Sequence, residues 1–321
     1  MQKRLLGQGL TVSAIGFGTL ALTGGYGAAD ELESADTIHA ALDAGVTMID
    51  TAGFYADGAV EQLVGKSVAG RRDQVVLATR GGVRAASTGG PPTIVDASPA
   101  ALRTACDDSL RRLGTDRIDL YYLARVDPKV PVEDSTGALA ELVAAGKVRH
   151  IGLSEAPPED LRRASAVHPI AALESEYSLW ERHIETAVLP TARELGVPLV
   201  AHTPLGKGML AGAVTGHASL GRGDHRRNHP RFQAGNLTYN RGLVDEAAAI
   251  AADLDITVAQ LALAWLLGRG TDILPIPGTR RRAHLAANVR ACEITLDPVH
   301  TARLDEIFAP GRAAGDRHRA S

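Results

Sequence analysis

The chain has 321 residues, 45% of them apolar, and a formal net charge of −3. This length and apolar content allow one large hydrophobic core. So small a charge excludes the strong electrostatic attraction typical of proteins that bind nucleic acid or a membrane surface. Cys106 and Cys292 lie far apart and in no metal-ligand spacing, so we expect a reducing compartment and no metal site.

The N-terminal segment has two basic residues, Lys3 and Arg4, before a fairly apolar stretch. Polar residues and glycines interrupt this stretch, and it has no small-residue cleavage site, so we expect no secretory signal. The longest apolar run, residues 261–267, is too short to span a bilayer. The prediction is a soluble, cytoplasmic protein with no membrane or nucleic-acid partner.

Short apolar runs rich in β-forming residues recur eight times, at residues 13–20, 46–50, 74–80, 117–126, 148–154, 170–177, 197–204 and 272–277. Segments with helical periodicity lie between them, among them 35–44, 99–113, 132–145, 157–166 and 186–195. This alternation predicts parallel βαβ units, and eight units predict an α/β fold of the closed (β/α)8 TIM-barrel type. A doubly wound sheet would carry a Gly-x-Gly-x-x-Gly turn, which Gly16 and Gly18 do not complete.

The two termini and one connection depart from this alternation. Residues 1–12 predict a short β-hairpin, turning at Gly7 and Gly9, that plugs the bottom of the barrel. Residues 206–241 show little periodicity, which predicts a long loop after the seventh strand. A loop of this length in a compact domain is usually functional. Residues 313–321 are polar and predict a flexible tail. No linker divides the chain, so we expect a single domain of 321 residues.

Residues 46–55 are the most informative segment for function. They predict a buried strand that ends in Asp50, with Tyr55 five residues later on the following loop. A phenol beside a carboxylate at the C-terminal end of a barrel strand can transfer protons. One polar residue at a strand end is common, but here seven positions at strand ends converge on one face. They are Asp50, Arg80, Ala124, Ser154, Glu174, His202 and residues 276–280.

Motifs that carry a family resemblance are spread over nearly the whole chain. Besides residues 46–55, they are Gly16-Phe17-Gly18-Thr19-Leu20 with Tyr26-Gly27, Tyr121-Tyr122 with Arg125-Val126-Asp127-Pro128, Ile151-Gly152-Leu153-Ser154-Glu155-Ala156, Glu176-Tyr177-Ser178-Leu179-Trp180, Thr203-Pro204-Leu205-Gly206-Lys207-Gly208, Pro230-Arg231-Phe232-Gln233, and Leu274-Pro275-Ile276-Pro277-Gly278-Thr279 with Asn288. With them the chain resembles the aldo-keto reductases, particularly the bacterial and plant branch related to auxin-induced proteins. The resemblance implies a barrel enzyme that moves hydride between a nicotinamide cofactor and a carbonyl.

The resemblance assigns a catalytic tetrad position by position, with two substitutions. Tyr55 matches the general acid that protonates the carbonyl oxygen, and Asp50 matches the acid that pairs with a cation beside that phenol. The cation is lysine in the family and Arg80 here. Because a guanidinium stays charged and binds carboxylates in a fork, we expect Arg80 and Asp50 to form a bidentate pair that still polarises Tyr55. The fourth member, histidine in the family, is replaced by Ala124.

The alanine at position 124 removes a hydrogen-bond donor to the developing oxyanion, and losing such a donor typically costs about 10²–10³ in turnover. Three explanations stay open. Tyr55 acts alone, a substrate group or a water fills the gap, or the reaction is not ordinary ketone reduction. The space vacated beside Ala124 would also suit a bulkier substrate.

The resemblance also places the nicotinamide end of the cofactor. Ser154, Glu155 and Glu174 occupy the positions that hold its carboxamide, although Glu174 replaces a glutamine and loses a donor. His202 stands where an aromatic ring stacks on the nicotinamide. Imidazole can stack, but it also titrates near neutral pH, so His202 is a second candidate for proton transfer. Of the two roles we favour stacking.

Arginines at the start of the last barrel helix point to NADP(H) rather than NAD(H). Guanidinium forks at a helix N-terminus suit the 2′-phosphate. The candidates there are Gly278, Thr279, Arg280, Arg281 and Arg282, with His284 and Asn288 on the next turns, where the family contacts adenine. The other cofactor-binding candidates from the resemblance are Asp50, Gly18, Thr19, Leu20, Thr203, Pro204, Leu205, Gly206, Lys207, Gly208 and Ile276.

The candidate substrate pocket is lined by Tyr26, Phe54, Ala124, Arg125 and Trp180. Within residues 222–231, His225 and His229 lack acidic or thiol partners at a metal-ligand spacing. We therefore expect this segment to be solvated or to cover the substrate.

The leading hypothesis is an NADP(H)-dependent oxidoreductase acting on an aldehyde, ketone or imine of a small organic molecule, with specialised metabolism as a setting that fits the composition. A second hypothesis keeps the barrel but assigns it a dehydration, elimination or isomerisation, with Tyr55, Arg80 and His202 as acid, electrostatic support and base. A third is an NADP-binding regulatory protein, which the retained Tyr55 argues against because a sensor needs no proton donor. The oligomeric state does not follow from the sequence.

Overall fold

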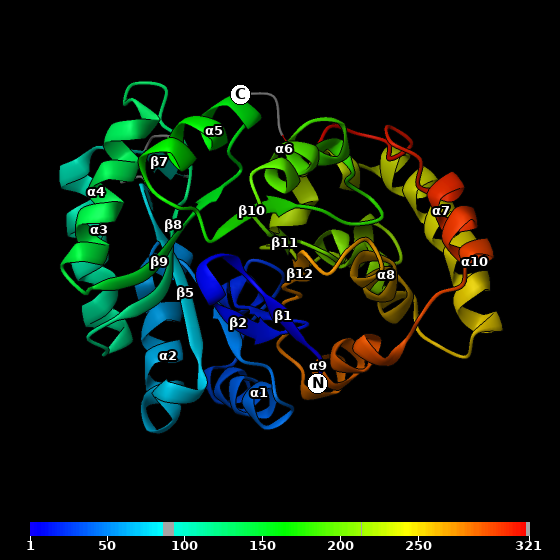
Figure 1. Cartoon of the computed structure of the whole chain (residues 1–321). Coiled ribbons are helices and arrows are strands. Elements are labelled where there is room, and N and C mark those ends of the chain that lie inside the picture. Colours follow the sequence, from blue (N-terminus) through cyan, green and yellow to red (C-terminus); the bar gives the residue numbers. More distant parts are fainter. Residues whose placement is uncertain (86–92, 213, 319–321) are drawn as a thin grey trace.

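Eight parallel strands form one curved sheet in the middle of the protein (Figure 1). The structure is a computed structural model that describes residues 1–85, 93–212 and 214–318. The strand order is β3 (Phe17–Gly18), β4 (Met48–Asp50), β5 (Val76–Gly81), β8 (Ile118–Leu123), β9 (Val148–Ser154), β10 (Ala172–Glu176), β11 (Leu199–His202) and β12 (Ile273–Pro275). Backbone hydrogen bonds from Gly16 N to Pro275 O (2.9 Å) and from Gly18 N to Pro277 O (3.3 Å) join the last strand to the first. The predicted (β/α)8 barrel is confirmed.

Helices pack around the outside of the strands. They are α1 (Glu31–Asp43), α2 (Ala59–Val68), α3 (Pro99–Leu113), α4 (Val132–Ala144), α5 (Pro158–Val167), α6 (Val188–Glu194), α7 (Ala234–Asp253), α8 (Val258–Leu267), α9 (Arg282–Arg290) and α10 (Pro298–Ile307). The periodicity places α3 correctly, but α1 begins earlier than predicted, because the Asp30 side chain accepts from Glu33 N (2.8 Å) and caps the helix. Within the described chain no single helix is long and apolar enough to cross a membrane. The pair α7 and α8 meets that test only when joined across an 87° bend.

The N-terminal hairpin covers the bottom of the barrel. Its strands β1 (Lys3–Leu5) and β2 (Thr11–Ser13) pair antiparallel, and the connection between them contains the 3-10 turn η1 (Gly7–Gly9). Gly7 N donates to Ala171 O (2.8 Å), and a Cβ on Gly7 would lie 2.8 Å from Ala171 Cα. Only glycine permits this close approach to the barrel wall.

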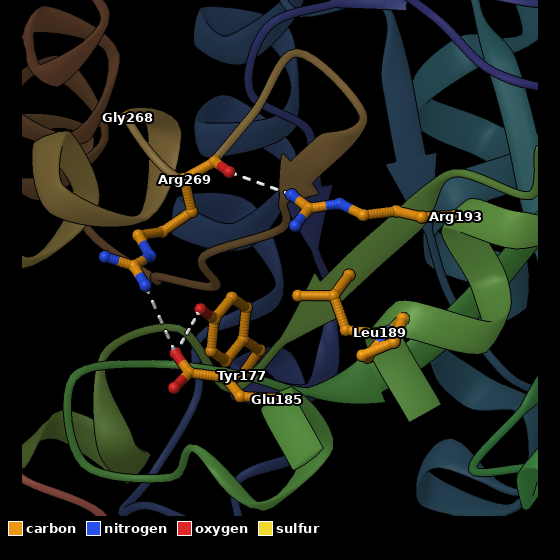
Figure 2. Close-up of a pocket in the computed structure, with 7 residues that line it drawn as sticks. Tyr177, Glu185, Leu189, Arg193, Gly268 and Arg269 are labelled. Atoms are coloured by element: carbon orange, nitrogen blue, oxygen red, sulfur yellow. Dashed lines mark hydrogen bonds and ion pairs between the residues drawn. The ribbon is translucent and has the colours of Figure 1, made fainter. Parts of the chain in front are cut away.

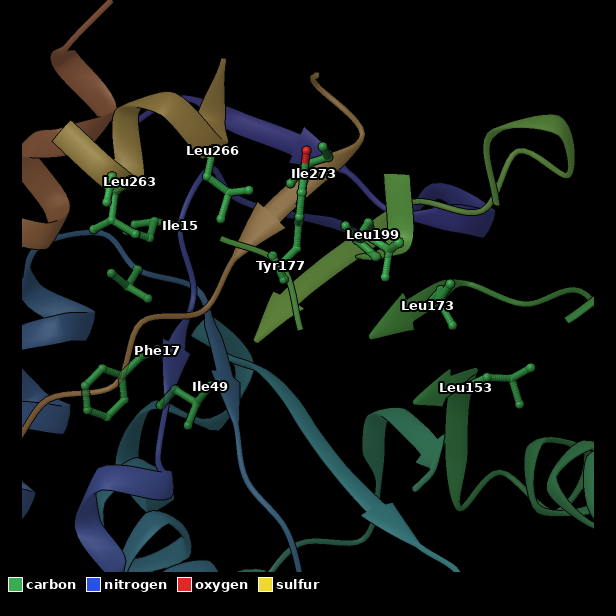
Figure 3. Packing of buried hydrophobic residues seen from close by; sticks show 14 of the residues in the cluster. Ile15, Phe17, Ile49, Leu153, Leu173, Tyr177, Leu199, Leu263, Leu266 and Ile273 are labelled. Carbon is green, nitrogen blue, oxygen red and sulfur yellow. The ribbon is translucent and has the colours of Figure 1, made fainter. Parts of the chain in front are cut away.

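Side chains that alternate along the strands fill two apolar layers. Met48 faces the barrel interior, whereas Ile49 faces the helices, as the period of two along a strand requires. Figure 3 shows part of the outer layer, with Leu263 and Leu266 on α8 and, on or next to the strands, Ile15, Phe17, Ile49, Leu153, Leu173, Tyr177, Leu199 and Ile273. The inner layer includes Leu6, Val12, Met48, Ala78, Leu120, Tyr122, Ala172, Val200 and Leu274.

The connection after β11 is long, as predicted, but it ends sooner. It contains the short 3-10 turns η6 (Gly206–Ala211), η7 (His217–Ser219), η8 (His225–Asn228) and η9 (Pro230–Phe232). Helix α7 then begins at Ala234, inside the range predicted as loop. Its first turns carry glycine, asparagine and threonine, which are poor helix formers, so the sequence did not reveal them.

Two other segments differ from the sequence-based picture. A small antiparallel pair, β6 (Val83–Ala85) and β7 (Thr93–Val95), follows β5 and was not predicted. Residues 313–318 lie against the barrel, where Asn240 exchanges hydrogen bonds with Ala314 O (2.9 Å) and Ala314 N (2.8 Å). The flexibility predicted for this C-terminal tail stays a prediction. The last residues of the tail, 319–321, lie outside the described residues.

We predict that Gly152→Ala destabilises the barrel. A Cβ at this position would lie 2.6 Å from Tyr122 Cδ1 and 2.7 Å from Ala172 O, so the wall of the barrel would have to shift. Overpacking of this kind costs about 1–3 kcal/mol, and urea unfolding should report a lower midpoint.

The matched control is Gly137→Ala in α4, where nothing lies within 4 Å of the added Cβ. This change should stabilise the protein by about 0.5–1 kcal/mol, because alanine loses less backbone entropy in a helix. Equal midpoints for the two variants would contradict the packing described for the interior.

Candidate active site

Three charged side chains from different strands meet inside the upper part of the barrel. Asp50 ends β4, Arg80 lies near the end of β5, and Glu174 lies in β10, with exposed fractions of 2%, 5% and 1%. Arg80 Nη2 donates to Asp50 Oδ1, Arg80 Nη1 lies 2.5 Å from Glu174 Oε2, and Arg80 Nε donates to Thr51 O (3.2 Å). We call Asp50, Arg80 and Glu174 the buried triad.

The predicted bidentate pair between Arg80 and Asp50 is therefore wrong. The guanidinium divides its donors among three acceptors, because Glu174 reaches Arg80 from the opposite side of the barrel interior. Glu174, expected at the nicotinamide carboxamide, is engaged by Arg80 instead. Burial raises the pKa of Asp50 well above its usual value, and the Glu174 charge adds to this rise while Arg80 opposes it. Burial also acts to lower the pKa of Arg80, but the two carboxylates raise it well above its ordinary value.

A strained turn holds Tyr55 at the mouth of the barrel, at the start of η3 (Tyr55–Gly58). Tyr55 N donates to Ala52 O (3.1 Å), and the next residues, Ala56 and Asp57, have φ of 47° and 52°. The Tyr55 ring meets Phe54 edge-on, with centroids 5.1 Å apart. Burial raises the pKa of the Tyr55 phenol, the Arg80 charge opposes this, and Asp50 and Glu174 reinforce it. The phenol therefore stays protonated at neutral pH.

The loop after β11 reaches across the mouth to the segment around Tyr26. His225 N donates to Gly25 O (2.9 Å), and the Arg226 guanidinium lies 5.0 Å above the Tyr26 ring. Burial raises the pKa of Tyr26 to about 12, although Arg226 opposes this. Tyr26, Phe54 and Tyr55 are all half-buried and belong to one neighbourhood, since Tyr26 also acts on the Tyr55 phenol.

His202 uses both ring nitrogens in contacts with the protein. Its Nε2 lies 2.7 Å from Glu155 Oε1, and its Nδ1 lies 2.9 Å from Thr203 Oγ1. A substrate proton could reach either nitrogen only after one of these bonds breaks. This arrangement favours the stacking role predicted for His202 over the role of a base.

A network that the sequence did not predict surrounds this histidine. Arg317, from the C-terminal segment, donates from Nη2 to Glu155 Oε1 (2.6 Å) and from Nε to Glu176 Oε2 (2.8 Å). Lys207 Nζ lies 3.2 Å from Glu176 Oε1. No local pattern predicts the role of Arg317, because its partners lie 162 and 141 residues away in the chain.

These cations shift the two carboxyls of the network. Burial acts to raise the pKa of Glu155, but His202 and Arg317 outweigh it and hold the pKa well below its usual value. Burial likewise opposes the shift at Glu176, yet the charges of Lys207, His202 and Arg317 lower its pKa to about 2.

The predicted 2′-phosphate site divides into two parts. Arg280 turns away from the helix and donates to the carbonyls of Tyr26 (3.2 Å), Gly27 (2.5 Å) and Ala28. Arg281 and Arg282 are exposed at the start of α9, and no side chain or carbonyl of the described residues accepts from their guanidinium groups. On the same helix His284 is exposed and Asn288 is buried.

The remaining cofactor candidates line the strand ends between these two regions. Thr19 Oγ1 donates to Asp50 O (2.9 Å), and Arg125 Nη1 donates to Ser154 Oγ (3.2 Å). Thr203 and Lys207 have φ of 53° and 57°. The other candidates there include buried Gly18, Ile276, Thr279, Pro204 and Gly206, half-buried Leu205 and Gly208, and exposed Leu20 and Gly278.

Backbone strain is concentrated at these strand ends. Of the seven non-glycine residues with positive φ in the described chain, five follow β4, β9 or β11, namely Ala56, Asp57, Glu155, Thr203 and Lys207. Such conformations cost about 1–3 kcal/mol each and cluster at functional sites. The strain thus points to the same end of the barrel as the charged residues.

Two predicted pocket residues have other surroundings. Ala124 is fully buried at the end of β8, and room for a bulkier substrate beside it stays a prediction. Trp180 stacks on Phe232, with centroids 6.1 Å apart. Trp180 lines a cavity of about 230 Å³ under residues 308–313, which Tyr55 does not border.

A second cavity, of about 450 Å³, lies on the outside of the barrel next to α6 and the end of α8 (Figure 2). Its polar groups bind one another. Tyr177 donates to Glu185 Oε1 (2.6 Å), and Arg193 Nη2 donates to Arg269 O (2.9 Å). Neither cavity is lined by Asp50, Tyr55 or Arg80, so the site rests on the side chains at the strand ends.

We predict that Arg317→Ala lowers the free energy of unfolding by about 1–3 kcal/mol near pH 7, because Glu155 and Glu176 lose a charged partner in a mostly buried site. Their pKa values are depressed in the folded state, so this contribution is complete above the unfolded pKa near ~4.3. The difference from the wild type should shrink as the pH falls from there toward 2. Urea unfolding at a series of pH values measures it.

The control is Arg162→Ala, which breaks an exposed ion pair with Glu194 and should change stability little. A difference between Arg317→Ala and the wild type that is the same at all pH values would contradict the ionic role of Arg317.

Comparisons with known proteins agree with the barrel fold. The model of the aldo/keto reductase family matches residues 14–309. A probable aldo-keto reductase 1 of Glycine max is 41% identical over 320 residues, covering 97% of this chain and 90% of the relative. The glycerol dehydrogenase of Gluconobacter oxydans superposes with a TM-score of 0.87 at 28% identity, covering 99% of both chains. An aldo-keto reductase of Klebsiella pneumoniae, solved in complex with NADPH, does so with 0.76 at 31% identity over the whole of both chains. This chain belongs to the aldo-keto reductase family.

Proposed function

We propose that this protein is an NADP(H)-dependent oxidoreductase that interconverts an aldehyde, ketone or imine of a small organic molecule with its reduced form. The observation that carries the proposal is the Tyr55 phenol, held by a strained turn at the end of β4 and acted on by the charge of Arg80. Family membership and the NADPH complex of the Klebsiella pneumoniae relative support the same chemistry.

The residues present fit NADP(H) at its phosphate end. The guanidinium groups of Arg281 and Arg282 have no partner in the described chain and stand at a helix N-terminus, where such groups suit the 2′-phosphate. Arg280 would act indirectly, by holding the segment from Tyr26 to Ala28 in place. When bound, the cofactor supplies or accepts the hydride.

The nicotinamide end differs from the family pattern. Ser154 is available to the carboxamide, and Arg125 holds its hydroxyl. Glu155 and Glu174 are each engaged by an arginine, so neither replaces the amide donor that the family has at position 174. The His202 ring is oriented by Glu155 and Thr203, which suits stacking on the nicotinamide.

Tyr55 supplies the proton in the reducing direction. A phenol with a raised pKa is neutral at physiological pH and therefore carries the proton that a carbonyl oxygen needs in reduction. Arg80 stabilises the phenolate that remains, since a nearby cation favours the charged form. In the oxidising direction the same phenolate accepts the proton of the alcohol.

The non-redox hypothesis has less support, because both nitrogens of the proposed base, His202, are engaged. A regulatory NADP-binding protein has no use for the strained turn that presents Tyr55. Both alternatives are outcomes of the same experiment. Product formation without net change in nicotinamide absorbance would support the first, and NADPH binding without turnover of any carbonyl would support the second.

We predict that Tyr55→Phe lowers NADPH-dependent reduction of a responsive aldehyde or ketone by about 10²–10⁴, the usual contribution of a general acid. NADPH binding, measured by fluorescence titration, should be retained. The control is Tyr239→Phe, which removes the hydroxyl of an exposed tyrosine on α7. Unchanged turnover in Tyr55→Phe would refute the assignment of the acid.

Arg281→Ala should weaken NADPH binding about tenfold, equivalent to ~1.4 kcal/mol, while NADH binding stays the same. The reason is the loss of a charge-assisted hydrogen bond to the 2′-phosphate, which NADH lacks. Arg280→Ala, in contrast, should weaken the binding of NADPH and NADH to a similar extent, because the segment from Tyr26 to Ala28 loses its hydrogen bonds to the Arg280 side chain. If the two variants changed the ratio of NADPH affinity to NADH affinity equally, the separate roles of Arg281 and Arg280 would be contradicted.

A further inference from the structure

The buried triad contains two carboxyl groups and one cation. The charged and titratable groups that act on it come from every element around it: Asp50 at the end of β4, Tyr55 on the following turn, Arg80 in β5, Tyr122 in β8, Glu174 in β10, and Tyr26 acting through Tyr55. Among the described residues Arg80 is the one cation in this set. If both carboxyls were ionised, the triad would carry one uncompensated negative charge.

That charge would lie in a site with almost no exposure to solvent, since none of the three side chains is more than 5% exposed. An unpaired buried ion costs several kcal/mol, and proteins usually avoid this cost by keeping the group protonated. A single proton held between the two carboxyls would remove that charge.

The hydrogen bonds leave room for a proton. Arg80 binds Asp50 through Oδ1, whereas Asp50 Oδ2 is buried and has no partner among the described residues. The Tyr122 hydroxyl is buried nearby and also has no partner in the described chain, and its ring lies 5.5 Å below the Arg80 guanidinium.

We propose that Asp50 and Glu174 share one proton at neutral pH, so that the buried triad is electrically neutral, and that Glu174 is thereby a positioning residue that sets the charge beside Tyr55. The proposal of a shared proton rests only on the geometry of the buried triad. The effect of that proton on Tyr55 deepens the proposed function and rests on the proposed function.

The effect has a definite sign. As the pH rises and the triad loses its proton, one negative charge appears beside Tyr55, and a negative charge disfavours the phenolate. Tyr55 then becomes a weaker acid, and reduction falls on the alkaline side. In Glu174→Gln, ionised Asp50 and Arg80 already form a neutral pair, so this triad has no proton to lose.

Infrared spectroscopy of the protein without cofactor, in deuterated buffer, tests the proton itself. The wild type should show the C=O stretching band of a buried protonated carboxyl at neutral pH, and the band should disappear as the pH is raised. Glu174→Gln should lack it, provided that circular dichroism shows the wild-type fold. The matched control is Glu61→Gln. Glu61 is equally buried, but its partner Arg112 (2.6 Å) pairs with no second carboxylate among the described residues, so this variant should keep the band.

No such band in the wild type, or the same band in folded Glu174→Gln, overturns the shared proton. The titration of the wild type tests the shared proton even if Glu174→Gln does not fold. Because the measurement needs no turnover, its result holds whether or not the reductase assignment is correct.

The pH profile of kcat tests the role in positioning. In Glu174→Gln the alkaline fall of reduction should move to higher pH, whereas a purely structural defect would lower kcat equally at every pH. If Glu174→Gln lost the infrared band but kept the alkaline fall of kcat at the wild-type pH, the proposed effect of the triad on Tyr55 would be overturned. Glu174→Asp, which keeps the second carboxyl, should restore a wild-type profile.

Discussion

The arrangement of this barrel interior depends on a guanidinium that must be satisfied where water cannot reach it. Arg80 is 5% exposed, and its donors meet Asp50, Glu174 and the carbonyl of Thr51. A buried cation requires such partners, since an unpaired one would cost several kcal/mol. Arginine is wider than the lysine of the family pattern and has donors in a rigid fork, so a second acid across the barrel becomes possible. Glu174 fills that role.

The neighbours of the triad follow from the same requirement. The Tyr122 ring lies under the guanidinium, and this placement is possible because Gly152 in β9 leaves space that a Cβ would occupy. Tyr55, held above by its strained turn, then experiences a field with one cation and two acids rather than a simple ion pair. The substitution of one residue of the tetrad is thus accommodated by several strands together.

A second set of charges lies closer to the mouth and has a different task. Glu155, Glu176, His202, Lys207 and Arg317 connect the ends of β9, β10 and β11 to the C-terminal segment. Here the two acids, Glu155 and Glu176, are matched by two basic side chains, Lys207 and Arg317, and both carboxyl pKa values are lowered, whereas that of Asp50 is raised. The inner set suits the handling of protons, and the outer set fixes the position of His202.

The alternation of apolar runs with helical periodicity was enough to determine the barrel, and the strand ends together with the family resemblance were enough to nominate Asp50, Tyr55, Arg80, Glu174 and His202 as site candidates. Both depend on patterns within about twenty residues of chain, which local propensity and burial control. Tertiary structure alone decided the partners: Arg80 with Glu174, Arg280 with the carbonyls after Tyr26, and Arg317 with Glu155 and Glu176. Long side chains choose among acceptors from distant segments, and only the closed barrel determines which of these lie within reach.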